Sequence, residues 1–412
     1  MPNKVLFQLC CLMTMLCVAS LSPAADKYVR KGASGSGTSW SDAYGDFNTV
    51  SWSGMTSGNT LWVAAGSYTG SLPSISTSGL SIKRATVASH GTSTGWSDAY
   101  DDQVTVNPSG QFLSINANNT TVDGASHSPW KFRVVGVKSP GGMILIDANN
   151  GTVRNMDMDG NYESGPDGGN EDCFRIAGGD SITLEYNFIH DYIYAGGSHS
   201  DGVQMPSGTN FIYRYNISRN NGMHVFLGDV AWYGSSGWVN NVKIYGNVFY
   251  NTNSYYSYDT IDCKNCTSNS SYYFYIENNT FDTLNAYGNR VLIYQNGGST
   301  AQLYFRNNIL YNSSPNDATS GIHSYNNYYG TTAPTETGAY VGDPQFTDRT
   351  NHIYSLKPTS PVKDIGTNLG YTQDIVDTAL PTASGSGYPM GAYAVGTAGA
   401  TKPAAPTSLT VR

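Results

Sequence analysis

The chain has 412 residues, only 13% of them charged, and a net charge of −8. Lys4 is the only charged residue before Asp26, so the chain from residue 26 onward carries −9. This balance excludes binding of nucleic acid through a global positive field. It does not exclude an acidic polysaccharide, whose binding would need a local basic cluster or a bridging cation.

Residues 1–25 have the pattern of a secretory signal peptide. Lys4 supplies the positive charge, residues 5–21 form an apolar core, and the small residues Ala24 and Ala25 follow it. No second apolar run is long enough to span a membrane. We therefore expect a secreted monomer without a transmembrane segment.

A repeat organises the middle of the chain. Five segments share an asparagine, at Asn187, Asn216, Asn247, Asn279 and Asn308, and residues 153–160 resemble an earlier, degenerate copy. A period near 30 residues is typical of a solenoid, and short apolar/polar alternation broken by Asn and Gly favours β-strands. These features predict an all-β fold, the single-stranded parallel β-helix.

The repeated asparagine has a structural interpretation. At the same corner of each turn of the coil, its amide can hydrogen-bond the asparagines above and below. The residues two positions before these asparagines form another column along the coil. We interpret this column as a solvated face whose charged side chains pair weakly between turns. Its members are Glu185, Arg214, Tyr245, Glu277 and Arg306.

Both ends of the repeat region resemble a known group. Residues 28–47 and 58–71 are similar to the N-terminal start of right-handed parallel β-helix (pectin-lyase-like) proteins, and residues 343–368 and 388–396 to their C-terminal end. The resemblance implies a right-handed coil with N- and C-terminal caps over residues 26–395. It also implies an exported carbohydrate-active protein, although the group includes lyases, hydrolases, epimerases and adhesins. Residues 396–412 read as a Pro/Ala/Thr-rich linker that ends like the first strand of a fibronectin-type domain.

A second column runs through the strands that precede the asparagine corners. Each of these segments begins with Asp, Asn or Ser and has apolar residues at its third and fifth positions. Alternation sends those apolar residues inward and the residue between them outward. The expected outward strip is Arg175, Gln204, His224, Asp262, Leu292 and His323.

The residues that start these strands form an acidic column of Asp172, Asp201, Asn221 and Asp259. Such residues often only bond backbone amides at turns. However, carboxylates stacked one turn apart repel each other and favour a cation between them. We therefore expect Asp172, Asp201 and Asp259 as ligands of a Ca²⁺ ion.

Long insertions between these strands are rich in aromatic residues. Rings on a rigid coil make suitable walls for a sugar-binding groove, with Gln204 on its floor. The expected wall residues are Trp232, Tyr233, Trp238, Tyr255 and Tyr256. His199, two residues before Asp201, is a further candidate for proton transfer, whereas His190 lies in the repeat and is interpreted as structural.

Three cysteines follow residue 25. Cys263 and Cys266 are expected to form a local disulfide bond, because no second metal-binding pair accompanies them. Cys173 is expected to be a buried free thiol.

Three functions fit these residues. A polysaccharide lyase is the first, with Arg175 or Ca²⁺ neutralising a uronate, His224 as the base, and His199 or a tyrosine as the acid. A polygalacturonase-like glycoside hydrolase is the second, with Asp201 paired with Asp259 or Asp262. The third is a non-catalytic glycan-binding or surface protein.

Overall fold

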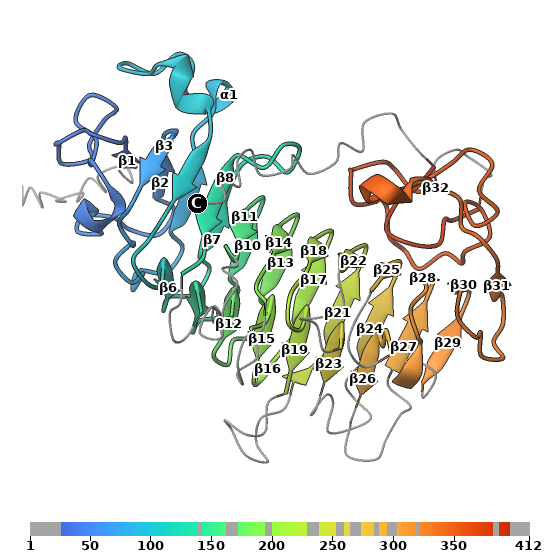
Figure 1. Ribbon diagram of the computed structural model, residues 1–412. Helices are drawn as coiled ribbons and strands as arrows, with labels where there is room; N and C mark the ends of the chain where they lie inside the picture. The colour runs from blue at the N-terminus through green and yellow to red at the C-terminus, as the bar shows by residue number, and fades with distance from the viewer. Residues whose placement is uncertain are drawn as a thin grey trace, which may run out of the picture.

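The computed structural model describes residues 26–137, 142–161, 172–193, 200–228, 239–252, 259–263, 273–283, 288–294, 303–317, 321–381 and 387–395. Three long parallel sheets run along the coil, and two of them extend from its N-terminal to its C-terminal end (Figure 1). Through the middle of the chain, each turn of the coil (a rung) adds one short strand to each sheet. This arrangement is the parallel β-helix that the repeat predicts.

The three sheets are named here by their strands in spatial order. Sheet A contains β1 (Lys27–Val29), β2 (Thr60–Val63), β4 (Ser81–Arg84), β7 (Thr121–Asp123), β10 (Thr152–Arg154), β13 (Thr183–Glu185), β17 (Ile212–Arg214), β21 (Val242–Tyr245), β24 (Phe274–Glu277), β27 (Leu303–Arg306) and β29 (Ile322–Ser324). Sheet B contains β3 (Gly66–Tyr68), β5 (Val104–Val106), β8 (Phe132–Val135), β11 (Asp157–Asp159), β14 (Phe188–His190), β18 (Ile217–Arg219), β22 (Val248–Tyr250), β25 (Thr280–Asp282), β28 (Ile309–Tyr311), β30 (Asn327–Tyr329) and β31 (Tyr340–Val341). Sheet C contains β6 (Leu113–Ile115), β9 (Ile144–Ile146), β12 (Phe174–Ile176), β15 (Val203–Met205), β19 (Val225–Leu227), β23 (Ile261–Cys263) and β26 (Leu292–Tyr294).

Smaller elements lie outside the three long sheets. Helix α1 (Val87–His90) projects beside its N-terminal end (Figure 1). Two short pairs of strands lie outside the long sheets: β16 (Gly208–Thr209) with β20 (Val239–Asn240), and β32 (Phe346–Asp348) with β33 (Ile353–Leu356). The 3₁₀ helices are η1 (Phe47–Thr49), η2 (Asp98–Asp101) and η5 (Arg349–Asn351).

Alternation along three-residue strands builds the core. From β10 to β24, one inward residue of each sheet A strand stacks on that of the next rung: Val153, Leu184, Tyr213, Ile244 and Ile276, each fully buried. Every buried apolar side chain of this size contributes about 1.5–3 kcal/mol. The coil therefore derives its stability from a continuous apolar interior.

The asparagine ladder that the repeat predicts is confirmed. From β13 to β30, sheets A and B are joined by two-residue corners, and the second corner residue is the shared asparagine. From Asn187 to Asn308, each asparagine donates its backbone N–H and its side-chain amide to the Oδ1 of the next, at 2.8–3.2 Å. All members are fully buried.

The ladder extends one step beyond the predicted repeat and ends on a carboxylate. Asn308 bonds Asn326, although only 18 residues separate them, and Asn326 donates its backbone N–H to Glu336 Oε1 at 2.8 Å. Because every amide points its NH₂ group toward this end, the aligned dipoles leave partial positive charge there. The buried Glu336 side chain meets that charge, and it also contacts His323 and Tyr328.

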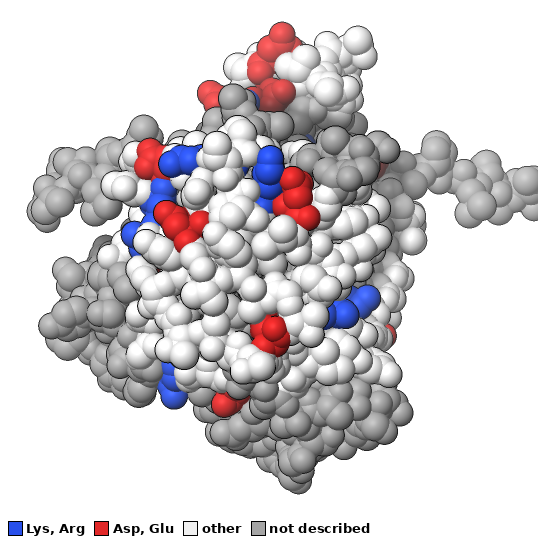
Figure 2. Space-filling view, turned by 90° about the vertical axis from the view of Figure 1, so that its right-hand side faces the viewer, with Lys and Arg blue, Asp and Glu red and all other residues white. Residues whose placement is uncertain are grey.

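The pairs between rungs that we expected in the charge column of sheet A are confirmed, but the column is not a solvated face, because Glu185 and Glu277 are buried. Arg214 Nε lies 2.7 Å from Glu185 Oε2, and Arg306 Nε lies 2.7 Å from Glu277 Oε1. At the C-terminal end of the coil, acidic and basic side chains also lie beside one another on a mostly uncharged surface (Figure 2). The described residues on that face gather into no basic patch.

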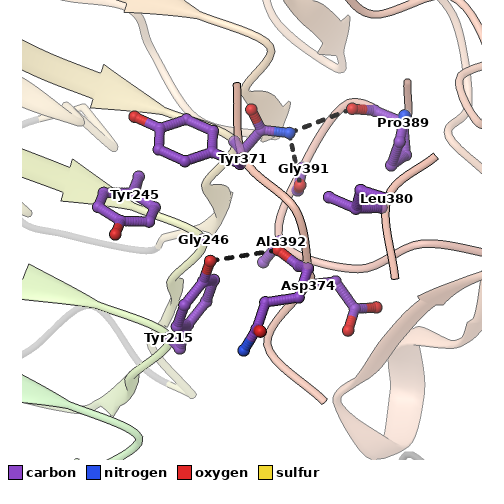
Figure 3. A pocket seen from close by; sticks show the side chains of 11 residues that line it. Tyr215, Tyr245, Gly246, Tyr371, Asp374, Leu380, Pro389, Gly391 and Ala392 are labelled. Atoms are coloured by element: carbon purple, nitrogen blue, oxygen red, sulfur yellow. Dashed lines mark hydrogen bonds between the residues drawn. The ribbon is translucent and has the colours of Figure 1, made fainter. Parts of the chain in front are cut away.

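The C-terminal segment folds back along the corner between sheets A and B. Tyr371 stacks on Tyr245 with ring centroids 4.3 Å apart, and Asn278 Nδ2 donates to the carbonyl of Pro389 at 3.2 Å. A small cavity remains between the coil and this segment, lined by Tyr215 and Tyr245 on one side and Leu380 and Pro389 on the other (Figure 3). It is far too small for a sugar ring.

Candidate functional site

Sheet C differs from the other two sheets in its connections. From β10 onward, sheets A and B meet at two-residue corners, whereas residues 160–173, 191–202 and 251–260 lead into β12, β15 and β23. Residues 264–273 and 295–302 leave the far ends of β23 and β26. Sheet C is thus the sheet that long connections border at both ends. Long loops on a rigid scaffold are the usual carriers of binding and catalysis.

The outward strip of sheet C differs from the predicted one at its third rung. The paired residues are Arg175, Gln204, Phe226 and Asp262, in that order along the coil. Arg175 is partly exposed, whereas Gln204, Phe226 and Asp262 are 3%, 1% and 7% exposed. The predicted adjacency of Arg175 and Gln204 is confirmed, and a phenyl ring stands where we expected His224.

The error has a physical cause. Asp201 bridges Met223 and not Asn221, so the third strand is shifted by two residues. A shift of two keeps apolar residues on the inside, and alternation therefore cannot detect it. Asn221 instead holds the corner between sheets B and C, where its Oδ1 accepts from the backbone N–H of Tyr192 at 3.1 Å.

His224 is consequently a buried residue ahead of its strand. Its Nδ1 lies 2.7 Å from Ser218 Oγ and its Nε2 lies 3.0 Å from Asn251 Oδ1. Burial lowers the pKa of His224 to about 4, so the ring is neutral at pH 7. Both nitrogens are occupied, and the expected exposure of His224 as a catalytic base was wrong.

Two further members of the expected strip were also misplaced. Leu292 is fully buried and pairs with the inward Ile261, so it does not face outward. His323 lies on β29 in sheet A, beside Phe305. Both errors arose because we extended the alternation pattern to later rungs, where alternation alone does not determine the register of the strands.

The acidic column is only partly as expected. Asp172 and Asp201 lie on adjacent rungs, and Asp172 Oδ1 accepts from the backbone N–H of Asp201 at 3.1 Å. Met223 occupies the next rung and separates them from Asp259. Asp259 lies 2.6 Å from the Nε of Arg290. A single metal site built from all three aspartates is therefore wrong, and only the Asp172–Asp201 pair remains.

Several predicted residues lie outside the described part of the chain. They are His199, Trp232, Tyr233, Trp238, Tyr255, Tyr256 and Cys266. Cys263, at the end of β23, belongs to a disulfide bond. Cys173 is a buried free thiol, as expected.

A network of six charged residues at the neighbouring corner escaped the sequence analysis. It occupies the outer side of sheet B where β8, β11, β14 and β18 end, and consists of Arg133, Asp157, Asp159, His190, Asp191 and Arg219. His190 lies at its centre, with Nε2 2.9 Å from Asp157 and Nδ1 2.7 Å from Asp191. The interpretation of His190 as structural agrees with this placement.

The electrostatics of the network follow from those contacts. Burial alone would lower the pKa of His190, but hydrogen bonds to Asp157 and Asp191 raise it to about 9. A carboxylate on each nitrogen requires both to carry a proton, which only the imidazolium provides. Arg219 Nη2 lies 3.0 Å from Nδ1, and the Asp191 carboxylate bridges these two cations.

The comparisons with known proteins concern the fold. No model of a known protein family matches the chain, and neither does any curated protein. Among solved structures, the crystal structure of pectate lyase Pel9A matches with a TM-score of 0.51 and 14% identity, over 91% of this chain and 98% of that chain. The shared fold is the right-handed parallel β-helix, as the resemblance implied. Within the described ranges, no helix has the length and apolar character needed to cross a membrane.

Proposed function

We propose that this protein is a secreted polysaccharide lyase that cleaves a uronic-acid-containing glycan by β-elimination along sheet C. The observation that carries the proposal is a partly exposed guanidinium, Arg175, on sheet C, which long connections border at both ends. The solved neighbour with the same fold is a pectate lyase, which favours the same substrate class.

The chemistry assigns distinct roles to the residues. β-Elimination needs the uronate carboxylate neutralised, a base for the C5 proton and an acid for the leaving oxygen. Arg175 neutralises the carboxylate, with Gln204 beside it on the floor and Asp262 further along the strip. Because His224 is buried, the base for the C5 proton is His199, which is two residues from Asp201 in the chain, and a tyrosine of the long connections donates the proton to the leaving oxygen. The aromatic residues of the long connections provide stacking surfaces for the sugar rings.

Removal of the Arg175 guanidinium is expected to abolish most turnover. Arg175→Ala should lower kcat/KM by roughly 100-fold or more, since it deletes a charge that stabilises the developing enolate. The measurement is the ultraviolet absorbance of unsaturated products from polygalacturonate, alginate and glycosaminoglycans. Lys243→Ala, an exposed cation on sheet A, is the matched control and should leave turnover unchanged. Reducing sugar released without absorbance would identify a hydrolase, and binding without turnover a glycan-binding protein.

A Ca²⁺ requirement is the second expectation for this site. Carboxylate oxygens are the ligands that Ca²⁺ prefers, and Asp172 and Asp201 are buried like charges on adjacent rungs. A cation held there would neutralise charge near the uronate. Chelation should therefore suppress turnover, and added Ca²⁺ should restore it in the wild type but not in Asp201→Asn. Full activity in the presence of a chelator would contradict this expectation.

A further inference from the structure

The side-chain oxygen of Gln204, Oε1, is a buried polar atom without a hydrogen-bond partner. Val203 and Met205 face the core, so alternation places Gln204 on the outer side of sheet C, although the residue is only 3% exposed. Its Oε1 is shielded from solvent and accepts no hydrogen bond. The six ladder asparagines are buried to the same degree, and each accepts hydrogen bonds at its Oδ1.

An unsatisfied amide at this place is costly. A buried polar group without a partner loses its hydration and gains nothing in return, so native proteins leave few of them. Leucine or methionine would fill the same position without that cost. Positions that sacrifice stability in this way are characteristic of functional sites.

The neighbours of Gln204 indicate what would satisfy it. Arg175 lies on the preceding rung and Phe226 on the following one, so a cation, an amide oxygen and an apolar ring follow one another along the coil. A uronate presents a carboxylate, hydroxyl groups and an apolar ring face. The order of the three side chains matches these three features of a sugar.

We propose that Gln204 is a specificity-determining residue that accepts a hydrogen bond from a free hydroxyl of the uronate whose carboxylate Arg175 binds. The inference rests on the proposed function and adds which substituent of the sugar the site recognises. An acyl or methyl group on that hydroxyl removes the donor and leaves Oε1 unpaired in the complex. Sites that hydrogen-bond a substrate hydroxyl discriminate strongly against analogues that lack it. The protein should therefore prefer uronans with unmodified hydroxyls.

Gln204→Leu tests this through two independent readouts. Without substrate, the melting temperature should rise, because the variant replaces an unpaired amide with an apolar side chain. With substrate, the wild type should cleave a polyuronate at least about tenfold faster than its O-acetylated form, and the variant should reduce that ratio to near one. The ratio should fall because Gln204→Leu cleaves the unmodified polymer more slowly than the wild type does.

Gln103→Leu is the matched control, since Gln103 is exposed and lies next to β5, far along the chain from sheet C's middle rungs. It should change neither the melting temperature of the coil nor the ratio. An unchanged ratio in an active Gln204→Leu variant would overturn the specificity role and leave the proposed function intact. A lower melting temperature would show that the amide is structural. A wild type that cleaves no uronan would refute the proposed function, and this inference with it.

Discussion

Substitution of Asn247 by leucine in the middle of the ladder is expected to destabilise the protein by about 3–5 kcal/mol, since each buried unsatisfied group costs about 1–3 kcal/mol. Asn247 Oδ1 accepts from the backbone N–H of Asn216 at 2.8 Å and from its amide at 3.2 Å. Asn247 Nδ2 donates to the carbonyl of Tyr213 at 2.9 Å. Leucine removes all of these partners at a fully buried corner, where no water can replace them.

Equilibrium unfolding in denaturant measures the effect, and Asn149→Ala is the matched control. Asn149 also accepts the backbone N–H of the next rung, from Asp180 at 2.8 Å, but its side chain is exposed. Water replaces that bond, and the control should therefore cost no more than about 1 kcal/mol. Equal losses in the two variants would show that the buried ladder contributes no more than an ordinary surface contact.

The ladder was predictable because its asparagines repeat at a nearly constant spacing. An asparagine at the same corner of successive rungs can hydrogen-bond its neighbours above and below. The last step of the ladder was not predictable from that spacing, since Asn326 follows Asn308 after only 18 residues. Glu336, which ends the ladder, belongs to no repeat at all. Its role depends on where the chain returns to the end of the coil, which is a long-range property.

The outward strip on sheet C shows a second limit of prediction from the sequence. Alternation determines which residues face the core, but it does not distinguish registers that differ by two residues. The sequence therefore predicted the pairing of Arg175 with Gln204, where the connections are regular, and misplaced His224, where a corner asparagine imitates a strand start.

The charged network at the corner of sheets B and C was open to prediction. The residue three positions after each ladder asparagine faces outward in sheet B, and this column reads His190, Arg219, Tyr250, Asp282 and Tyr311. Placing it beside Asp159 on the preceding strand would have brought the charges together. The protonation state was not open to prediction, because it depends on burial and on contacts from four strands.

Replacement of His190 by glutamine is expected to cost about 3–5 kcal/mol at neutral pH, the cost of breaking a buried ion pair. The imidazolium balances the third carboxylate of the network, whose other two are matched by Arg133 and Arg219. Burial would raise the pKa of Asp191, but the hydrogen bond and charge of His190, with Arg219, hold it well below its usual range. A neutral amide leaves one carboxylate uncompensated.

The effect of pH separates this charge from ordinary packing. Because the pKa of His190 is raised from 6.5 to about 9, its stabilisation is complete below pH 6.5 and is lost as the pH rises through about 9. Over this pH window the unfolding free energy of the wild type should fall by about 3 kcal/mol, whereas that of His190→Gln should not. The difference in stability between the two proteins should therefore shrink as the pH rises. Unfolding free energies at pH 6.5 and 9.5 measure it. His127→Gln, on a partly exposed ring 3.5 Å from Asp377, is the control and should produce a small change in unfolding free energy. A difference between wild type and His190→Gln that stays constant across the window would mean that His190 acts through its shape and not its charge.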